Sequence, residues 1–361
     1  MDSQQPSASA LPPRSSQSPI SAAMFRSGKR LLAAAGPLFA LLLVVLFFAI
    51  ADAMQGGVGN FASVGSVRLV GVQSVKVAVA ALGMTMIIIA GGIDLSAGTA
   101  AALSGCVGAY SLKHGYSIQS AIVFAVLSGA ACGLLNGALI SFLRLVPFII
   151  TLGTMTIFLG IGKTIAEDGG TIRPPTGSIP PWMDSMVTQF PEPLWVAWPL
   201  LPNFGWGVWM VLVLAIMMSL LLYQTVFGRH VFAIGSNEPT ARLCGVAVTK
   251  TKLAIYTLAG AFIGLAGVVD LARLGKGDAT AGLGLELEII AAVVIGGGSL
   301  AGGRGSVFGT LCGVLIVRVI NQGSTALGLE NQVENILLGV IIITAVAVDR
   351  LRQSRQSQQP I

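Results

Sequence analysis

The sequence contains few charged residues: Asp, Glu, Lys and Arg make up 10% of its 361 residues, whereas 54% are hydrophobic and the mean hydropathy is +0.83. Soluble domains carry about 25% charged residues, so this composition excludes an ordinary soluble domain and indicates an integral membrane protein. The net charge of +6 is spread over short loops. That distribution argues against a nucleic-acid-binding surface, and it bears instead on how the chain is oriented in a membrane.

Histidine and cysteine are also scarce, which removes several kinds of site. The two histidines, His114 and His230, lie far apart in the sequence, so it indicates neither a zinc site nor a serine–histidine hydrolase. The cysteines form no C-x-x-C pair, and we expect no disulfide framework among Cys106, Cys132, Cys244 and Cys312. The three that lie in apolar segments are expected to behave as small buried hydrophobic residues.

The chain also lacks a nucleotide-binding motif of its own. Residues 162–164, Gly-Lys-Thr, match the end of a phosphate loop, but the first glycine of that motif would fall at Ile157. Gly296 and Gly298 resemble part of a dinucleotide fingerprint, but no acidic residue follows about 20 positions later. We therefore expect no cofactor on this chain.

Apolar segments, by contrast, are abundant, and many are long enough to span a bilayer as helices. They are residues 31–51, 75–92, 96–112, 118–142, 147–166, 207–227, 253–274, 286–298, 304–323 and 333–349. The first could instead be a signal peptide, because a cleavage-like Ala-Asp-Ala ends it, but it is longer than a signal core of about 7–15 residues. Several segments are short or broken by glycine. The sequence therefore predicts an all-α polytopic membrane protein of eight to ten transmembrane helices, with ten preferred.

The charges of the loops predict the orientation of the chain. Basic residues gather before the first span, at residues 228–252 and after the last span, whereas residues 167–206 hold four acidic residues and one basic residue. Both termini and the segment 228–252 are therefore expected in the cytoplasm, and the loop 167–206 in the periplasm. On this basis residues 25–350 form the transmembrane domain, between a disordered tail at 1–24 and a short cytoplasmic tail at 351–361.

One stretch, residues 288–313, combines an apolar run with a cluster of glycines, and residues 91–98 resemble it. Each is predicted to be a helix, a glycine break and a second helix. The backbone groups freed by such a break are tolerated in a membrane only when they are buried in protein or face a wet cavity. Two similar breaks suggest a duplicated architecture, although glycine-rich membrane segments also converge by composition alone. Two glycine ladders match the small-xxx-small pattern of close helix packing, at Gly129, Gly133 and Gly137 and at Gly305, Gly309 and Gly313.

Charged residues beside these breaks allow two interpretations. Asp94 is predicted to be the N-cap of the helix that follows it, and it is also a candidate polar group on a conducting path. Arg304 either pairs with an acid such as Asp94 or lies at the cytoplasmic interface with its charge in water, and we favour the interface. Other charged residues lie near segment ends and are expected at the membrane interfaces: Lys76, Asp270, Arg273 and Arg318.

The segment 228–252 is basic and amphipathic, and it is long enough for a short helix along the inner membrane face. It is either a solvated connector or a docking segment for a cytoplasmic partner. In the second case, the residues expected to matter are Gly228, Arg229, Gly235, Glu238, Arg242 and Gly245, with a short helix over 238–243.

Three stretches, residues 81–96, 228–245 and 286–313, make the chain resemble the ribose, xylose and arabinose-type permeases of bacterial monosaccharide ABC importers. The resemblance implies about ten spans in the inner membrane and a dimer with a second permease copy or a close paralogue. It also implies a cytoplasmic ABC ATPase that holds ATP and Mg, and a periplasmic sugar-binding protein. In that family the loop matching 228–245 contacts the ATPase. The chain departs from the family at Ser236, where a second glycine is common, and in its long N-terminal tail.

An uncharged sugar needs hydroxyl and amide groups along its path more than ion pairs. The candidate path residues are Thr85, Asp94, Ser96, Asn136, Thr151, Thr154, Ser299, Arg304 and Asn321. For each of them the alternative is a hydrogen bond that joins two helices. Two other functions compete with a sugar importer. An ion-coupled secondary transporter would have to rely on Asp94 as its deep carboxylate, and a membrane-embedded enzyme would need an acid–base or metal constellation that the sequence does not offer.

Overall fold

The computed structural model describes residues 19–55, 61–187 and 204–330 and parts of 332–347, and for residues 19–35 it describes the backbone alone. Most of the predicted N-terminal tail, the predicted C-terminal tail and part of the acidic loop lie outside the described residues. The chain divides inside α1 into two units, Met1–Gly36 and Pro37–Ile361. Pro37 begins the second unit, where a proline removes a helical hydrogen bond. All that follows concerns the second unit.

Within the described residues, seven helices are long and apolar enough to cross a membrane. They are α1 (Pro19–Met54, from Gly36 on), α2 (Val64–Ile89), α4 (Ile118–Leu143), α5 (Pro147–Ile165), α8 (Trp206–Gln224), α11 (Val248–Leu274) and α13 (Val307–Ala326). This confirms the prediction of a polytopic, helical membrane protein. Two further helices are shorter, α3 (Ala97–Lys113) and α12 (Leu285–Ile295). The 11 residues of α12 extend about 16 Å at 1.5 Å per residue, roughly half of a hydrocarbon core of about 30 Å.

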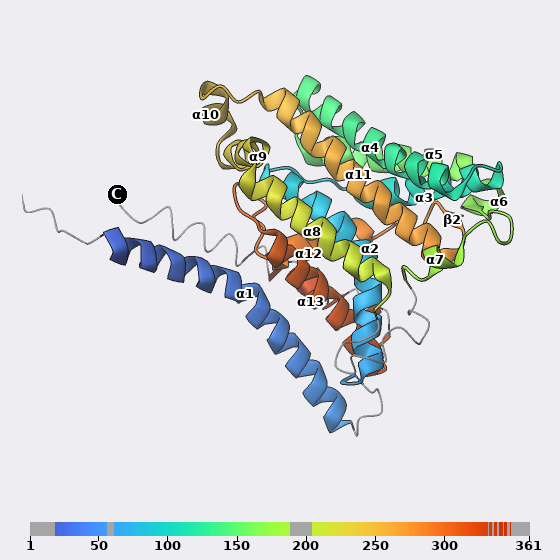
Figure 1. Cartoon of the computed structure of the whole chain (residues 1–361), viewed down its shortest axis with the longest axis horizontal. Coiled ribbons are helices and arrows are strands. Elements are labelled where there is room, and N and C mark those ends of the chain that lie inside the picture. The colour runs from blue at the N-terminus through green and yellow to red at the C-terminus, as the bar shows by residue number, and fades with distance from the viewer. Residues whose placement is uncertain are drawn as a thin grey trace, which may run out of the picture. The chain divides into compact units, whose positions relative to one another are not determined.

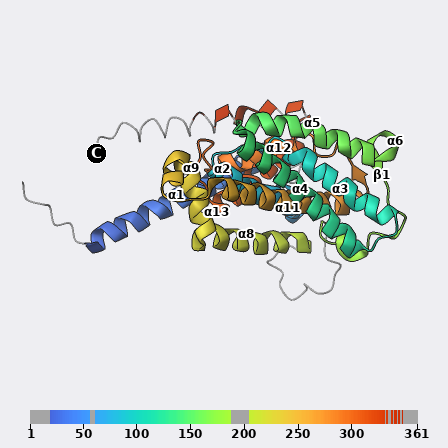
Figure 2. The same ribbon diagram turned by 90° about the horizontal axis from the view of Figure 1, so that it is seen from above.

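The two ends of the helix bundle differ in their connecting segments (Figures 1 and 2). At one end, called here the α9 end, lie α9 (Val226–Ser236) and α10 (Glu238–Leu243). At the other, called the strand end, lie α6 (Glu167–Gly170), α7 (Pro181–Asp184) and two short strands. The strands β1 (Thr171–Ile172) and β2 (Gly277–Asp278) pair antiparallel, with Thr171 opposite Asp278. This small ladder is an addition to the all-helical prediction.

The helices differ in how much of their surface faces the protein. In α2, 83% of the apolar window is buried inside the protein, against 22% in α5 and 28% in α8. The apolar side chains that α5 and α8 leave uncovered suit contact with lipid tails, which are as apolar as leucine. The helices α2, α13 and α11, with 83%, 72% and 61% of their apolar windows buried, are the most enclosed of the seven.

Glycines set the closest helix contacts. On α4, Gly129 and Gly133 pack against Gly260 of α11, and a Cβ added at Gly133 would overlap the carbonyl oxygen of Tyr256. On α13, a Cβ at Gly309 would overlap the carbonyl oxygen of Gly296 at the end of α12. The other members of the two predicted ladders lie against neighbouring elements as well, Gly137 against α11, Gly313 against α12, and Gly305 against Ile89 of α2. The sequence analysis did not single out the facing glycines of α11, Gly260 and Gly264, although their four-residue spacing was a visible signal.

Candidate functional site

Five of the predicted path residues meet at the break between α2 and α3, and we call them the Asp94 cluster: Asp94, Ser96, Asn136, Thr151 and Thr154. Asp94 Oδ1 accepts hydrogen bonds from the backbone N of Ser96 at 2.8 Å and from its Oγ at 2.6 Å. Asn136 Nδ2 of α4 donates to Ser96 Oγ at 2.8 Å, and its Oδ1 accepts from Thr154 Oγ1 of α5 at 2.7 Å. Thr151 Oγ1 donates to the carbonyl of Ile93 at 3.2 Å. These bonds fasten α4 and α5 to the break.

The prediction that Asp94 is the N-cap of α3 is wrong by two residues. Ser96 occupies the N-cap position and makes no side-chain cap bond. Asp94 instead bonds to the backbone two residues ahead of it, as short acidic side chains do in turns. The carboxylate therefore holds the break in shape before the helix begins.

A second meeting point, called here the glycine junction, joins the two glycine breaks to the end of α9. Its members are Gly91, Gly235, Gly302 and Gly303. The backbone N of Gly303 donates to the carbonyl of Ile89 at 2.8 Å, and a Cβ added at Gly235 would overlap that same carbonyl. Gly91 and Gly302 have φ angles of +80° and +87°, a backbone conformation that favours glycine. The two stretches that look alike in sequence therefore lie side by side, in direct contact with the predicted docking segment.

The remaining path candidates lie elsewhere. Thr85 Oγ1 and Thr310 Oγ1 share a buried hydrogen bond of 2.8 Å between α2 and α13. Ser299 is buried in the second break, where its backbone N donates to the carbonyl of Arg304 at 3.1 Å. The side chain of Arg304 is exposed at the α9 end, and its interfacial position stays a prediction. Asn321 is buried on α13, and its Oδ1 has no hydrogen-bond partner among the described residues.

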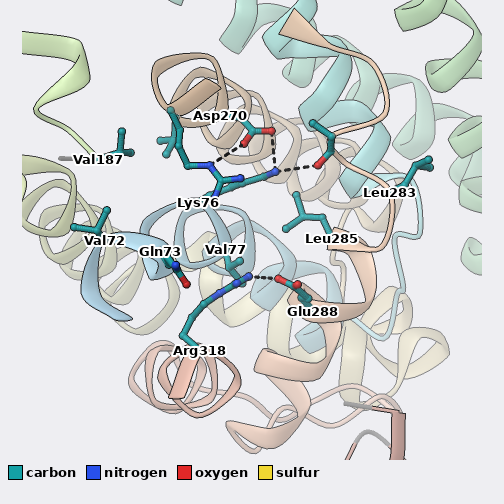
Figure 3. Close-up of a pocket in the computed structure, with 13 residues that line it drawn as sticks. Val72, Gln73, Lys76, Val77, Val187, Asp270, Leu283, Leu285, Glu288 and Arg318 are labelled. Carbon is teal, nitrogen blue, oxygen red and sulfur yellow. Dashed lines mark hydrogen bonds and ion pairs between the residues drawn. The ribbon is translucent and has the colours of Figure 1, made fainter. Parts of the chain in front are cut away.

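A pocket of about 180 Å³ opens between α2, α11, α12 and α13 near the strand end, and we call it the charged pocket. Lys76 Nζ of α2 lies 2.8 Å from Asp270 Oδ2 of α11. Arg318 of α13 pairs with Glu288 of α12. The two ion pairs lie on opposite sides of the pocket (Figure 3).

Three of the four segment-end charges are buried against neighbouring helices, and their expected position at the membrane interfaces stays a prediction. The side chains of Lys76, Asp270 and Arg318 are only 13%, 6% and 13% exposed, whereas Arg273 is 53% exposed at the pocket's edge. Each buried charge meets an opposite charge on a neighbouring helix, which makes its burial tolerable. Glu288 is not among the residues predicted from the sequence. A signal for it was present, because the apolar segments hold two cations, Lys76 and Arg318, and Asp270 and Glu288 balance them.

The predicted docking segment folds into two helices at the α9 end. Asn237 caps α10 by accepting a hydrogen bond from the backbone N of Thr240 at 2.9 Å. Glu238 pairs with Lys252 at 2.7 Å and with Arg242 at 3.2 Å. Burial raises the pKa of Glu238, but the bonds from Lys252 and Arg242 outweigh that effect and leave the pKa below its usual value. Leu243 projects away from the protein and is 87% exposed.

The other residues named for this segment have different surroundings. Gly228 packs against the end of α8, where a Cβ would overlap the carbonyl of Leu222. Arg229 is exposed on α9. Gly245 follows α10 with a φ of +85°, which ends the helix in a conformation that favours glycine.

A bundle of membrane-spanning helices, with paired charges around a pocket between them and a helical segment fixed to two helix breaks, defines a multi-pass membrane transport protein. Residues 70–346 match the model of a family described as the permease component of branched-chain amino acid transport systems. The chain belongs to this family of inner-membrane permease components.

Relatives from several bacteria cover most of the chain. The ribose import permease protein RbsC of Escherichia coli (strain K12) is 34% identical over 305 residues, which cover 81% of this chain and 88% of the relative. The ribose import permease protein RbsC of Bacillus subtilis (strain 168) is 38% identical over 282 residues, covering 76% and 81%. The fructose import permease protein FrcC of Rhizobium meliloti is 35% identical over 318 residues, covering 88% and 85%. No solved structure matches the chain.

Proposed function

We propose that this chain is the membrane-spanning permease subunit of an ATP-binding-cassette importer that carries a monosaccharide across the bacterial inner membrane. The observation that carries the proposal is the similarity, over most of the chain, to import permeases whose names specify ribose and fructose. Further relatives are named for D-allose and for galactose and methyl galactoside. Because the relatives' substrates share many hydroxyl groups and no charge, an uncharged sugar is the substrate class.

Ten spans and a cytoplasmic position of both termini complete the proposed topology. The helix α3, the helix α12 together with the glycine break that follows it, and the helical residues described within 332–347 add three passes to the seven long ones. The α9 end faces the cytoplasm, because several basic residues lie there: Arg144, Arg229, Arg242, Lys250 and Arg304. The strand end carries the acidic residues Glu167, Asp184 and Asp278, and its basic residues Lys113 and Lys276 are paired with Glu167 and Asp278. The larger positive excess at the α9 end is what the positive-inside rule expects on the cytoplasmic side.

ATP hydrolysis takes place on a partner in this proposal, because the sequence has no nucleotide motif. The partners are a cytoplasmic ABC ATPase that binds ATP and Mg, a periplasmic sugar-binding protein, and a second permease copy or a close paralogue. The exposed surface of α10 is the docking surface for the ATPase. Motion at that surface would reach the glycine junction through α9, and from there the helices α2, α12 and α13 that line the charged pocket.

The proposal is tested by sugar uptake in a strain of the source bacterium that lacks this gene, with and without a plasmid copy. Radiolabelled D-ribose, D-fructose and D-galactose are the probes, and L-leucine is the contrasting solute. We expect the plasmid to restore uptake of at least one sugar, and we expect affinity purification of the chain to recover an ATPase. Uptake of L-leucine alone, or uptake driven by an ion gradient in proteoliposomes that contain no ATPase, would contradict the proposal.

A further inference from the structure

We propose that the charged pocket is a sugar subsite inside the membrane domain, in which one sugar hydroxyl donates to Asp270 Oδ1 and another accepts from Arg318 Nε. The inference rests on the proposed function and adds a place where the transported sugar pauses between the two sides of the membrane. It assigns a binding role to residues that sequence analysis placed at the membrane interfaces.

Asp270 supplies an unused acceptor to the pocket. The residue is 5% exposed, and its Oδ2 accepts from Lys76 Nζ at 2.8 Å. Its Oδ1 is buried without a hydrogen-bond partner among the described residues. The nearest cationic group, Arg273 Nε, lies 3.9 Å away, which is too far for a hydrogen bond. Native proteins seldom leave a buried carboxylate oxygen unpaired, so a donor from outside the chain is expected here.

Arg318 supplies an unused donor on the opposite side of the same pocket. Its Nη2 bonds to Glu288 Oε2, which fixes the guanidinium in place. Its Nε is buried without a hydrogen-bond partner in the described part of the chain. Asp270 and Arg318 both line the pocket (Figure 3). An unused acceptor and an unused donor on two residues that line one space fit a polyhydroxyl solute, because each hydroxyl group can both donate and accept.

The size and charge of the pocket also favour a small uncharged solute. Its volume of about 180 Å³ is more than ten times the roughly 10–15 Å³ that a single water needs. The two cations and two anions of the ion pairs cancel, leaving Arg273 as a partly exposed positive charge at the edge. An ion would have to compete with these existing pairs, whereas a sugar can use the free oxygen and nitrogen without breaking them.

The position of the pocket connects it to the proposed coupling route. Its walls include α2 and α12, and each of these helices ends at a break that contributes to the glycine junction. A shift of the two breaks would therefore change the separation of Lys76 and Glu288, which lie on those helices on opposite sides of the pocket. The same movement that follows ATP binding on a partner could then release a sugar held between them.

The test measures whether sugar protects the pocket. Leu283 lines the pocket and is 50% exposed, so Leu283→Cys is the reporter, with the exposed Cys244 replaced by serine. The full-length chain in lipid nanodiscs is treated with a small thiol reagent, alone or with D-ribose, D-fructose, D-galactose or L-leucine. We expect at least one sugar to slow labelling several-fold. Thr176→Cys, exposed at the same end but outside the pocket, should label at the same rate with and without sugar.

Two substitutions then test the assigned hydrogen bonds. In Asp270→Asn and Arg318→Gln, the sugar concentration for half-maximal protection should rise about tenfold, as expected for one lost bond to a charged group. Asp278→Asn, an acid at the strand end that does not line the pocket, should leave it unchanged. If either pocket variant fails to fold, Leu283→Trp fills the pocket's mouth while keeping both ion pairs, and it should abolish uptake in a protein that still purifies normally.

Separate outcomes identify which idea fails. Sugar uptake by cells carrying Leu283→Cys, without protection by any sugar, would overturn the subsite and leave the importer standing. Protection that persists equally in Asp270→Asn and Arg318→Gln would also overturn it, as would normal uptake by Leu283→Trp. Protection by L-leucine but by no sugar would overturn the subsite as a sugar site. Failure of wild-type cells to take up any sugar would instead contradict the proposed function.

Discussion

Asp94 and Asp270 are both carboxylates buried inside a membrane bundle, yet their surroundings give them different roles. Asp94 is surrounded by neutral hydroxyl, amide and backbone donors, and Ser96 bonds twice to its Oδ1. Asp270 is paired with a cation, and its Oδ1 has no hydrogen-bond partner in the described part of the chain. Polar residues inside membranes serve either to join helices or to meet a substrate. On these contacts Asp94 joins helices, and Asp270 is the better candidate for contact with a solute.

This difference predicts that Asp94 matters for stability through its acceptor oxygen more than through its charge. Asp94→Ala leaves the buried backbone N of Ser96 without its side-chain acceptor. We expect this loss to lower the free energy of unfolding by about 1–3 kcal/mol. Asp94→Asn keeps a carbonyl oxygen in the same place and should cost less. The measurement is the thermal unfolding midpoint of each purified protein in the same detergent. Equal losses in both variants would show that the negative charge itself is required.

The sequence could supply the members of the Asp94 cluster but not their grouping. Hydroxyl and amide residues in apolar segments are visible at once, and that is how Ser96, Asn136 and Thr154 were selected. Their contacts join three elements separated by 40 and 18 residues, and residue type alone carries no information about such distances. The charged pocket is hidden from the sequence for a related reason, because the partners Lys76 and Asp270 lie 194 residues apart.

Among the helices, glycine spacing was the most reliable guide. It predicted the breaks that end α2 and α12, and the ladders of α4 and α13 that the structure places against α11 and α12. It could not show that the two breaks touch, since Gly91 and Gly302 are 211 positions apart in sequence. It also could not separate glycines in a contact from glycines that face outward. A Cβ added at Gly153 or Gly160 of α5 would meet no described atom within 4 Å.

That contrast within one chain gives a matched pair of substitutions. Gly309→Leu would drive a side chain into the carbonyl of Gly296, and overpacking of this kind costs typically about 1–3 kcal/mol and sometimes more. Gly160→Leu makes the same chemical change at an exposed position of α5. We expect Gly309→Leu to reduce the yield of monodisperse protein and abolish uptake, and Gly160→Leu to behave as wild type. Normal yield and uptake for Gly309→Leu would mean that α12 and α13 are not held this closely in the membrane.

For the molecule as a whole, the exposed Cys244 provides a built-in probe of orientation. It lies at the α9 end, which the charge asymmetry assigns to the cytoplasm. In intact spheroplasts an impermeant maleimide should label Thr176→Cys at the strand end and leave Cys244 unlabelled. Cys244 should react once the membrane is permeabilised, and a Cys244→Ser control should remove that signal. Labelling of Cys244 from outside would invert the proposed topology.

Coupling to an ATPase is the last property that belongs to the whole molecule, and the structure changes which substitution tests it best. Glu238 is held by Lys252 and Arg242, so reversing its charge would disrupt α10 as well as any docking contact. Its lowered pKa means that the ion pairs are present above that pKa and are lost only as the pH falls through it. ATP-driven uptake should therefore not change through protonation of Glu238 between about pH 6 and 8 on the cytoplasmic side.

Leu243 separates docking from folding, because 87% of its surface is exposed and little of it packs against the described residues. Leu243→Glu places an unpaired charge in the proposed interface, and a mismatch there can cost several kcal/mol. We expect it to abolish uptake and release the ATPase during affinity purification while the unfolding midpoint stays at the wild-type value. Lys250→Glu, an exposed change outside α10, should keep the ATPase. If α10 were a solvated connector, Leu243→Glu would change the free energy of unfolding by about 0.5 kcal/mol or less and would leave uptake unchanged. Retention of the ATPase with normal uptake would therefore rule out docking through this helix.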